Sequence, residues 1–223
     1  MPEKAKIIGI EQVTHDVKKF TVEKPKGFVY EPGQACELAI DQPGWTDEAR
    51  PFTMTSLKAW DMLEFIIKAY PEHDGVTKKL HELDTGDFLL VHNAFGTIQY
   101  KGPGVFIAGG AGITPFIAMF RQLQADSKLE GNMLIFANKT SKDIILREEL
   151  IDVFGQGLVL VLSKEDAEGY EHGRIDGSMI KKHVRDFSQH FYVCGPPAMN
   201  DAVLKVLREL GARPDSLVFE GKQ

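Results

Sequence analysis

Two stretches of the chain combine glycine with residue types that suit a bound ligand, a phosphate group in the first and a planar group in the second. In the first, Gly109-Gly110-Ala111-Gly112 follows a short apolar run, and Pro115 then opens a helical pattern. Glycine adopts the positive φ of a tight turn and lets backbone N–H groups approach an anion at a helix start. Proline suits the first helical turn, where its missing N–H costs nothing. The spacing departs from GxGxxG and from GxxxxGK[ST], so a glycine-rich connection without a ligand is the alternative.

The second stretch is residues 191–199, in which an apolar run ends at Cys194 and turns at Gly195 before Pro196 and Pro197 start a helix. In an open parallel sheet, ligands bind outside the carboxyl ends of the strands. We therefore expect Cys194 to lie beside the same crevice as the glycines of the first stretch. The alternative is that Cys194 is a small buried apolar residue, as most free cysteines are.

Two further segments nearer the N-terminus carry groups that could hold a cofactor. Arg50-Pro51-Phe52-Thr53 offers a planar cation for a phosphate, a ring for stacking and a hydroxyl. Residues 74–77, Asp-Gly-Val-Thr, stand at the predicted start of a helix, where N–H groups and a hydroxyl suit an anion. Taken singly, Arg50 could be an exposed strand residue, Phe52 a core residue and the threonine of the last segment a helix N-cap.

The first hundred residues must position the last two segments, and their pattern predicts β structure. Short alternating or β-branched runs are separated by turn residues, and one helix is predicted at 76–83. Six strands at this spacing with a single helix favour an antiparallel barrel. The predicted strands are 6–13, 19–23, 34–40, 51–57, 62–70 and 87–92.

The pattern changes after residues 101–104, Lys-Gly-Pro-Gly, from strand–turn repeats to alternating strands and helices. This alternation predicts right-handed crossovers and a doubly wound parallel sheet of five strands. We therefore expect a β-barrel domain over 1–101 and an α/β domain over 102–223. The predicted strands are 105–108, 133–137, 158–162, 191–194 and 217–219, and the predicted helices are 115–124, 144–153, 178–184 and 197–210.

Composition excludes several classes of protein. The 223 residues are 43% hydrophobic and 26% charged with a net charge of −6, which fits a globular chain and argues against broad nucleic-acid binding. Two cysteines, Cys36 and Cys194, cannot supply the four ligands of a typical iron–sulfur cluster, and the seven histidines show no metal-binding spacing. The N-terminal ten residues are too charged for a signal peptide, and no apolar run is long enough for a membrane span, so we expect a cytoplasmic protein.

The four segments together resemble the motifs of the ferredoxin–NADP(H) reductase superfamily, in the same order along nearly the whole chain. Residues 50–53 resemble its Arg-x-Tyr-Ser/Thr motif, with phenylalanine in place of tyrosine. Residues 74–77 resemble Gly-x-x-Ser/Thr, residues 109–115 resemble Gly-Gly-x-Gly-x-Thr-Pro, and residues 192–199 resemble Tyr-x-Cys-Gly-Pro-x-x-Met. The resemblance implies a flavin-binding barrel, with FAD as the expected flavin and FMN as the alternative, followed by an NAD(P)-binding domain.

The resemblance also implies which residues bind each cofactor. Thr53 is expected to reach flavin N5, while the missing tyrosine hydroxyl at Phe52 removes one contact to the ribityl chain. The expected flavin-binding residues are Arg50, Pro51, Phe52, Thr53, Ile67, Lys68, Gly75, Val76 and Thr77. The expected nucleotide-binding residues are Gly109, Gly110, Gly112, Ile113, Thr114, Pro115, Cys194, Gly195, Pro196 and Met199.

The expected reaction passes hydride from a nicotinamide in the cleft between the domains to the flavin. Thr53, Cys194 and Glu220 are the expected catalytic residues, with Thr53 and Glu220 as a proton path; the alternative is that Glu220 is a solvated terminal residue. Ser163 and Lys164, with Arg174, resemble the residues that bind the 2′-phosphate of NADPH. Acidic neighbours at 165, 166, 168 and 171 would repel that phosphate, so NADH stays open.

The sequence does not identify the electron acceptor. A flavodoxin, a ferredoxin or an oxygenase component is the expected protein partner, because an iron–sulfur cluster would have to lie on another chain. One alternative is a reductase subunit of a multi-component complex. Two others are a flavin or nucleotide sensor without turnover, and a plain nucleotide-binding protein with an unrelated barrel.

Overall fold

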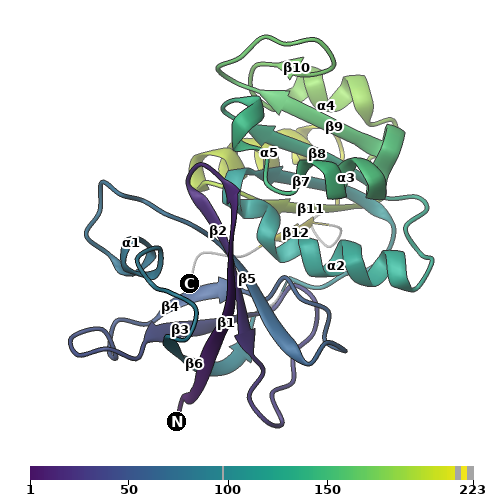
Figure 1. Ribbon diagram of the computed structural model, residues 1–223. Helices are drawn as coiled ribbons and strands as arrows, with labels where there is room; N and C mark the ends of the chain where they lie inside the picture. The colour runs from purple at the N-terminus through teal and green to yellow at the C-terminus, as the bar shows by residue number, and fades with distance from the viewer. Residues whose placement is uncertain (97, 214–216, 220–223) are drawn as a thin grey trace. The chain divides into compact units, whose positions relative to one another are not determined.

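The computed structural model describes residues 1–96, 98–213 and 217–219 (Figure 1). The chain divides into two compact units by its internal contacts. The first unit comprises residues 1–99 and 114–119, and the second comprises residues 100–113 and 120–223. Within the described residues, no helix is long and apolar enough to cross a membrane.

The first unit is built on a six-stranded antiparallel sheet in the order β4-β3-β6-β1-β2-β5. An isolated antiparallel bridge between Met54 and Phe65 joins the two edge strands, so the sheet closes on itself as predicted for a barrel. Among the described residues before the second sheet there is one α-helix, α1 (Val76–Leu80), and residues 114–119 of α2 (Thr114–Ala125) also belong to this unit. The strands are β1 (Glu3–Thr14), β2 (Val17–Glu23), β3 (Ala35–Ile40), β4 (Arg50–Thr53), β5 (Met62–Lys68) and β6 (Phe88–Phe95).

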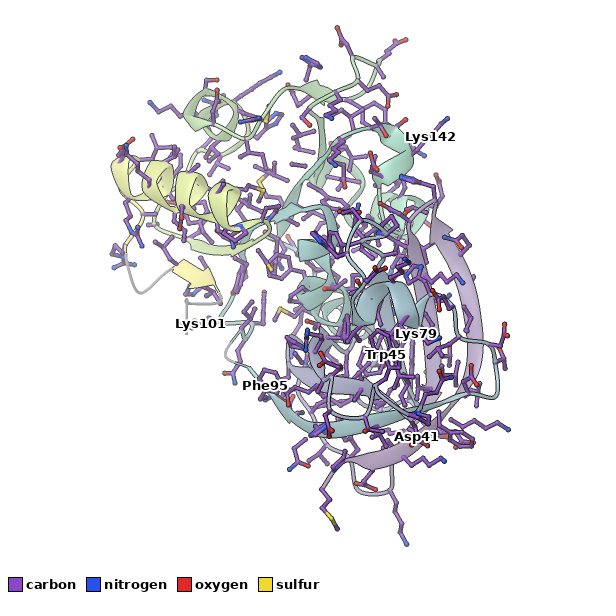
Figure 2. All side chains as sticks on the ribbon, turned by 90° about the vertical axis from the view of Figure 1, so that its left-hand side faces the viewer. Asp41, Trp45, Lys79, Phe95, Lys101 and Lys142 are labelled. Atoms are coloured by element: carbon purple, nitrogen blue, oxygen red, sulfur yellow. The ribbon has the colours of Figure 1, made fainter. Side chains whose placement is uncertain are left out.

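Alternating residues of these strands fill the barrel with large apolar side chains such as Phe20, Leu38 and Phe65, all fully buried. Trp45, in the connection between β3 and β4 and labelled in Figure 2, is half-buried against the same core. Full burial of a side chain such as Phe20 or Leu38 contributes about 1.5–3 kcal/mol, so this core stabilises the barrel.

The second unit carries a parallel sheet in the order β10-β9-β8-β7-β11-β12. Its central strands are largely apolar, as expected for strands covered on both faces. The strands are β7 (Gly104–Gly109), β8 (Met133–Asn138), β9 (Leu158–Leu162), β10 (Glu171–His172), β11 (His190–Cys194) and β12 (Leu217–Phe219). The helices are α2 (Thr114–Ala125), α3 (Arg147–Phe154), α4 (Gly177–His183) and α5 (Pro197–Glu209).

Aromatic stacking fixes one face of the central strands. The rings of Phe106 on β7 and Tyr192 on β11 are stacked with centroids 4.2 Å apart. Phe120 of α2 meets Phe106 edge-on at 4.9 Å and Phe154 of α3 at 4.7 Å. The opposite face packs against α4 and α5 through residues such as Ile180 and Leu207.

The structure corrects the prediction in two places. The parallel sheet has six strands rather than five, because β10 pairs only Glu171 and His172 with β9 and leaves no periodic signal in the sequence. The predicted helix at 144–153 begins later, at Arg147. Leu146 has φ = 52°, a left-handed conformation that interrupts the chain before the helix starts.

Candidate functional site

The end of β4 carries Thr53 and is fixed by backbone pairing on both sides. Thr53 lies opposite Ala35 of β3, and the following Met54 donates its N–H to the Gln34 carbonyl at 3.2 Å. The N–H of Thr55 then donates to the Glu64 carbonyl at 2.8 Å. Thr53 is half-buried, so its hydroxyl is held at a defined and accessible point of the barrel.

Polar side chains reinforce this closure just beyond Thr53. Thr55 donates its hydroxyl to the buried Glu64 carboxylate at 2.8 Å, and the Glu64 N–H donates to Ser56 Oγ at 3.0 Å. The Tyr30 hydroxyl donates to the Ser56 carbonyl at 2.9 Å, and burial raises the pKa of that phenol. Buried polar groups that are paired in this way specify one geometry, because leaving any of them unpaired is costly.

Arg50 lies at the exposed start of β4, as does Pro51. The Arg50 guanidinium donates to the Ala49 carbonyl at 2.7 Å and pairs with Glu48 at 3.1 Å. Both members of this ion pair are about half exposed, and such pairs contribute little to stability. The guanidinium can therefore exchange Glu48 for a phosphate at small cost. Phe52 is half-buried and packs against the barrel core, so only part of its ring is available for stacking.

The segment at the start of α1 presents backbone donors. Lys79 is the first residue whose N–H reaches back to the Gly75 carbonyl, so the preceding N–H groups of the turn have no partner within the helix. No side chain caps this end, and a Cβ on Gly75 would meet open space. The half-buried Thr77 hydroxyl is in the same turn. These features fit a phosphate-bearing group.

Two residues expected at the flavin have side chains that are buried in the barrel. Val76 is 3% exposed and Ile67 is 1% exposed, and both belong to the barrel core. The Ile67 carbonyl faces His81, whose Nε2 lies 2.8 Å away. Their apolar side chains fill the barrel interior, so the flavin-binding role expected for these two residues is compatible with a contribution from the backbone and stays a prediction. Lys68 is half-buried and pairs with Asp16 at 2.7 Å.

The turn after β7 divides its glycines between two tasks. Gly110 has φ = 52° and would direct a Cβ into open space, so it provides an unobstructed backbone. A Cβ on Gly109 would lie 2.4 Å from Met199 Sδ, and a Cβ on Gly112 would lie 2.4 Å from the Cys194 carbonyl oxygen. Gly109 and Gly112 therefore permit close packing inside the unit, whereas the side of Gly110 where a Cβ would stand is open.

The structure brings the two glycine-bearing strand ends together, as the sequence predicts. β7 and β11 are adjacent and parallel, with Ala108 opposite Cys194. Cys194 is half-buried. A Cβ on Gly195 would lie 2.9 Å from Met199 Cε, so this glycine makes room for Met199. The ligand-binding role expected for Gly195 stays a prediction beside this packing role.

The helix that follows the glycine turn begins at Thr114, directly after the Gly110–Ile113 3₁₀ turn. Thr114 is half-buried, whereas the side chains of Ile113 and Pro115 are buried. The last two can shape the turn and contribute backbone groups, but their side chains belong to the interior. Pro196 is exposed, and Met199 is half-buried beneath Gly109 and Gly195.

The segment proposed for a 2′-phosphate follows β9. Ser163, Lys164 and Arg174 are all exposed. Glu165 stands next to them, and its carboxylate accepts the Ser141 N–H at 2.7 Å and the Ser141 hydroxyl at 2.9 Å. A fixed negative charge therefore lies between the ends of β8 and β9. Glu220, the other predicted catalytic residue, lies outside the described residues.

The sequence assigned no role to two polar residues of the second unit, Tyr192 and Asn138. The Tyr192 hydroxyl accepts the N–H groups of Lys101 and Gly102 at 2.9 and 3.1 Å and donates to the Gly102 carbonyl at 2.7 Å. It thus ties the start of the unit (Lys101 is labelled in Figure 2) to β11. Asn138 ends β8 and is buried without a side-chain partner. A polar residue directly after an apolar strand run was the available signal.

Two family matches cover most of the chain. Residues 3–103 match the family described as FAD-binding domain, and residues 106–205 match the family described as oxidoreductase NAD-binding domain. The reductase component of propane 2-monooxygenase from Rhodococcus jostii is 26% identical over 97% of this chain and 62% of its own length. NADH–cytochrome b5 reductase 1 from Arabidopsis thaliana is 29% identical over 94% of this chain and 80% of its own length.

Solved structures show the same fold. The flavohem-like FAD/NAD-binding domain of a nitric oxide dioxygenase from Vibrio cholerae has a TM-score of 0.88 at 20% identity, with 98% of each chain covered. A ferredoxin–NADP⁺ reductase from Neisseria gonorrhoeae, solved with bound FAD and NADP, has a TM-score of 0.85 at 19% identity over 98% of this chain and 97% of its own. The chain spans about two thirds or less of the first curated relatives it matches.

Proposed function

Because the chain belongs to the ferredoxin–NADP reductase superfamily, we propose that it is an NAD(P)H-dependent flavoprotein reductase that uses FAD. The observation that carries the proposal is the order of the two family matches, FAD-binding over 3–103 and oxidoreductase NAD-binding over 106–205. FAD accepts hydride and releases electrons singly or in pairs, so it supplies the redox chemistry, while the protein supplies binding and orientation. We assign the flavin domain to residues 1–101 and the nucleotide domain to residues 102–223.

In the flavin domain, Arg50 and the free N–H groups at the start of α1 bind phosphate oxygens. Phe52 packs against the ring system, and the Thr53 hydroxyl forms the hydrogen bond at flavin N5. The support is physical: Arg50 is exposed and weakly paired, and Thr53 is fixed by the closure of the barrel. Glu220 completes a proton path with Thr53 in this proposal.

In the nucleotide domain, the backbone of the turn at Gly110 binds the pyrophosphate, and Cys194 borders the nicotinamide. The open space at Gly110 and the packing of Gly112 against Cys194 support these roles. We propose NADPH as the preferred donor, with Lys164 and Arg174 as its 2′-phosphate ligands. The test is to compare NADPH with NADH in wild type and in Lys164→Ala with Arg174→Ala; unchanged preference in the double variant would remove this assignment.

The electron acceptor is proposed to be a separate redox protein in the cytoplasm, such as a ferredoxin, a flavodoxin or an oxygenase component. Two relatives are named as reductase components of oxygenase systems, from Rhodococcus jostii and Pseudomonas putida. Cys36 and Cys194 are both free thiols, and two cysteines are too few for an iron–sulfur cluster. Any cluster that receives the electrons therefore lies outside these 223 residues.

The experiment is to purify the protein, identify the flavin released by denaturation, and measure NADPH- and NADH-driven reduction of ferredoxin, flavodoxin and ferricyanide. FAD release together with ferricyanide reduction supports a reductase, and the protein acceptor reduced at the highest kcat/KM identifies the acceptor class. A protein that binds FAD but is not reduced by either nucleotide would instead be a flavin sensor. Failure to bind any flavin after reconstitution would contradict the proposal.

A further inference from the structure

Two asparagines flank β8, and their surroundings differ completely. Asn132 precedes the amino end of the strand, and its carboxamide is fully engaged. Its Oδ1 accepts the Gly104 N–H at 3.2 Å, and its Nδ2 donates to the Leu129 carbonyl at 3.0 Å and to the Tyr100 hydroxyl at 3.2 Å. This carboxamide links three segments and has an evident structural role.

Asn138 is the last residue of β8, and its carboxamide is buried without a partner. The residue is 8% exposed, and neither Oδ1 nor Nδ2 forms a hydrogen bond within the described part of the chain. A buried carboxamide without partners is unfavourable, because both its donor and its acceptor have lost water. An apolar residue would fill this position at lower cost, so the sequence keeps a polar group where the fold does not use it.

The position of Asn138 indicates what could use it. Ala137 pairs with Gly109, so Asn138 lies one residue farther toward the carboxyl edge than the last paired residue of β7. The Gly110–Ile113 turn contacts β8. The backbone carbonyl of Asn138 accepts the Ser163 N–H at 3.0 Å, which places the end of β9 beside Asn138. Asn138 therefore stands between the glycine turn and the segment after β9, at the edge where open α/β sheets bind ligands.

We propose that the Asn138 carboxamide is a nucleotide-binding group of this protein, one that pairs with the ADP-ribose part of NAD(P)H. The inference rests on the proposed function. A carboxamide offers both a donor and an acceptor, which matches ribose hydroxyls and phosphate oxygens. Because Oδ1 and Nδ2 are shielded from solvent, engagement requires a rotamer change of Asn138 or a small opening of the Gly110–Ile113 turn.

The test compares Asn138→Leu with Asn132→Leu in the flavin-loaded protein. Titration calorimetry with ADP-ribose, NADPH and NADH gives Kd, and thermal unfolding gives Tm. Asn138→Leu should raise each Kd at least about 10-fold, the equivalent of one lost hydrogen bond of about 1.4 kcal/mol, while Tm stays level or rises. Asn132→Leu should lower Tm and leave Kd for ADP-ribose within about 2-fold, since its partners lie at the other end of the strand.

A third variant, Asn138→Asp, keeps the shape and replaces the donor with an acceptor that is ionised when exposed. Its ADP-ribose affinity should fall, and the loss should shrink at high salt if the ligand phosphates lie nearby. Unchanged Kd in Asn138→Leu, or a Tm loss like that of Asn132→Leu, would overturn the inference. If the wild-type protein binds and oxidises NAD(P)H and Asn138→Leu binds it equally well, the reductase proposal stands and only the role of Asn138 is refuted.

Discussion

Replacing Gly112 with alanine should separate the two strand ends that form the nucleotide side of the site. A Cβ at this position would lie 2.4 Å from the Cys194 carbonyl oxygen and 2.7 Å from Gly195 Cα. Contacts below 3.0 Å essentially never occur for a real Cβ, so the two segments would have to move apart by at least 0.6 Å. The clashing atoms are backbone atoms of β11 and its turn, so no side chain can rotate to absorb the change.

The expected magnitude follows from that displacement. Overpacking in a well-packed region costs about 1–3 kcal/mol of stability, and a misplacement of about 1 Å can cost about 100-fold in rate. We expect Gly112→Ala to lower kcat/KM for NAD(P)H by between about 10- and 100-fold. Flavin content should not change, because the expected flavin residues are in the other unit.

Steady-state kinetics with ferricyanide, alongside the absorbance ratio of flavin to protein, measures both effects. Gly177→Ala is the matched control, since its Cβ would meet Val206 Cγ1 at an ordinary 3.5 Å at the start of α4. Gly109→Ala should be intermediate, because the nearest atom is the Sδ of the flexible Met199 side chain. Wild-type kcat/KM in Gly112→Ala would refute the view that close packing of the two strand ends builds the site.

Three other predictions concern the hydroxyl, thiol and carboxyl groups of the second unit and the barrel. Tyr192→Phe removes the three hydrogen bonds of the hydroxyl of a fully buried residue. The free energy of unfolding, measured by urea titration, should fall by about 2–3 kcal/mol. A change below the error of the titration would contradict this expectation. Cys36 is buried, and desolvation raises its pKa to about 12. Iodoacetamide at neutral pH should therefore label Cys194 and not Cys36, and NAD(P)H should protect Cys194 from labelling. Equal labelling of the two cysteines would count against the burial of Cys36. The Met179 N–H and the Ser178 hydroxyl lower the pKa of Asp176 in the N-cap of α4. The contribution of the Asp176 carboxylate to the free energy of unfolding should therefore be present above its unfolded pKa near 4 and be lost as pH falls through the lower folded pKa. Asp176→Asn should then flatten the acid side of the Tm–pH profile. An identical slope in the variant and the wild type would refute this stabilisation.

The strands were predictable because each has a clear local pattern. The apolar β7 and β9 and the alternating β1 and β2 differ from their turns in composition, so the predicted positions agree with the structure to within a few residues. β10 was missed because two residues carry no period. The start of α3 was misplaced because Ile144 and Ile145 read as helix-compatible apolar residues, whereas they are buried before the break at Leu146.

Site residues were less predictable than the strands, since a motif identifies a segment but not the direction of each side chain. Ile67 and Val76 fall within expected flavin-binding segments, yet both side chains fill the barrel. Met199, four residues after Gly195, packs against the side of Gly195 where a Cβ would stand. Packing between segments that are distant in sequence decides such details, and a short motif does not reveal that packing.

In the proposed reaction, this chain transfers hydride from a nicotinamide nucleotide to a bound flavin. Anaerobic stopped-flow mixing of the flavin-loaded protein with NADPH, and separately with NADH, tests this transfer directly. We expect the oxidised flavin absorbance to bleach in a single turnover with at least one nucleotide, and we expect Gly112→Ala to slow this step while Gly177→Ala does not. Flavin that stays oxidised with both nucleotides would refute the proposed transfer.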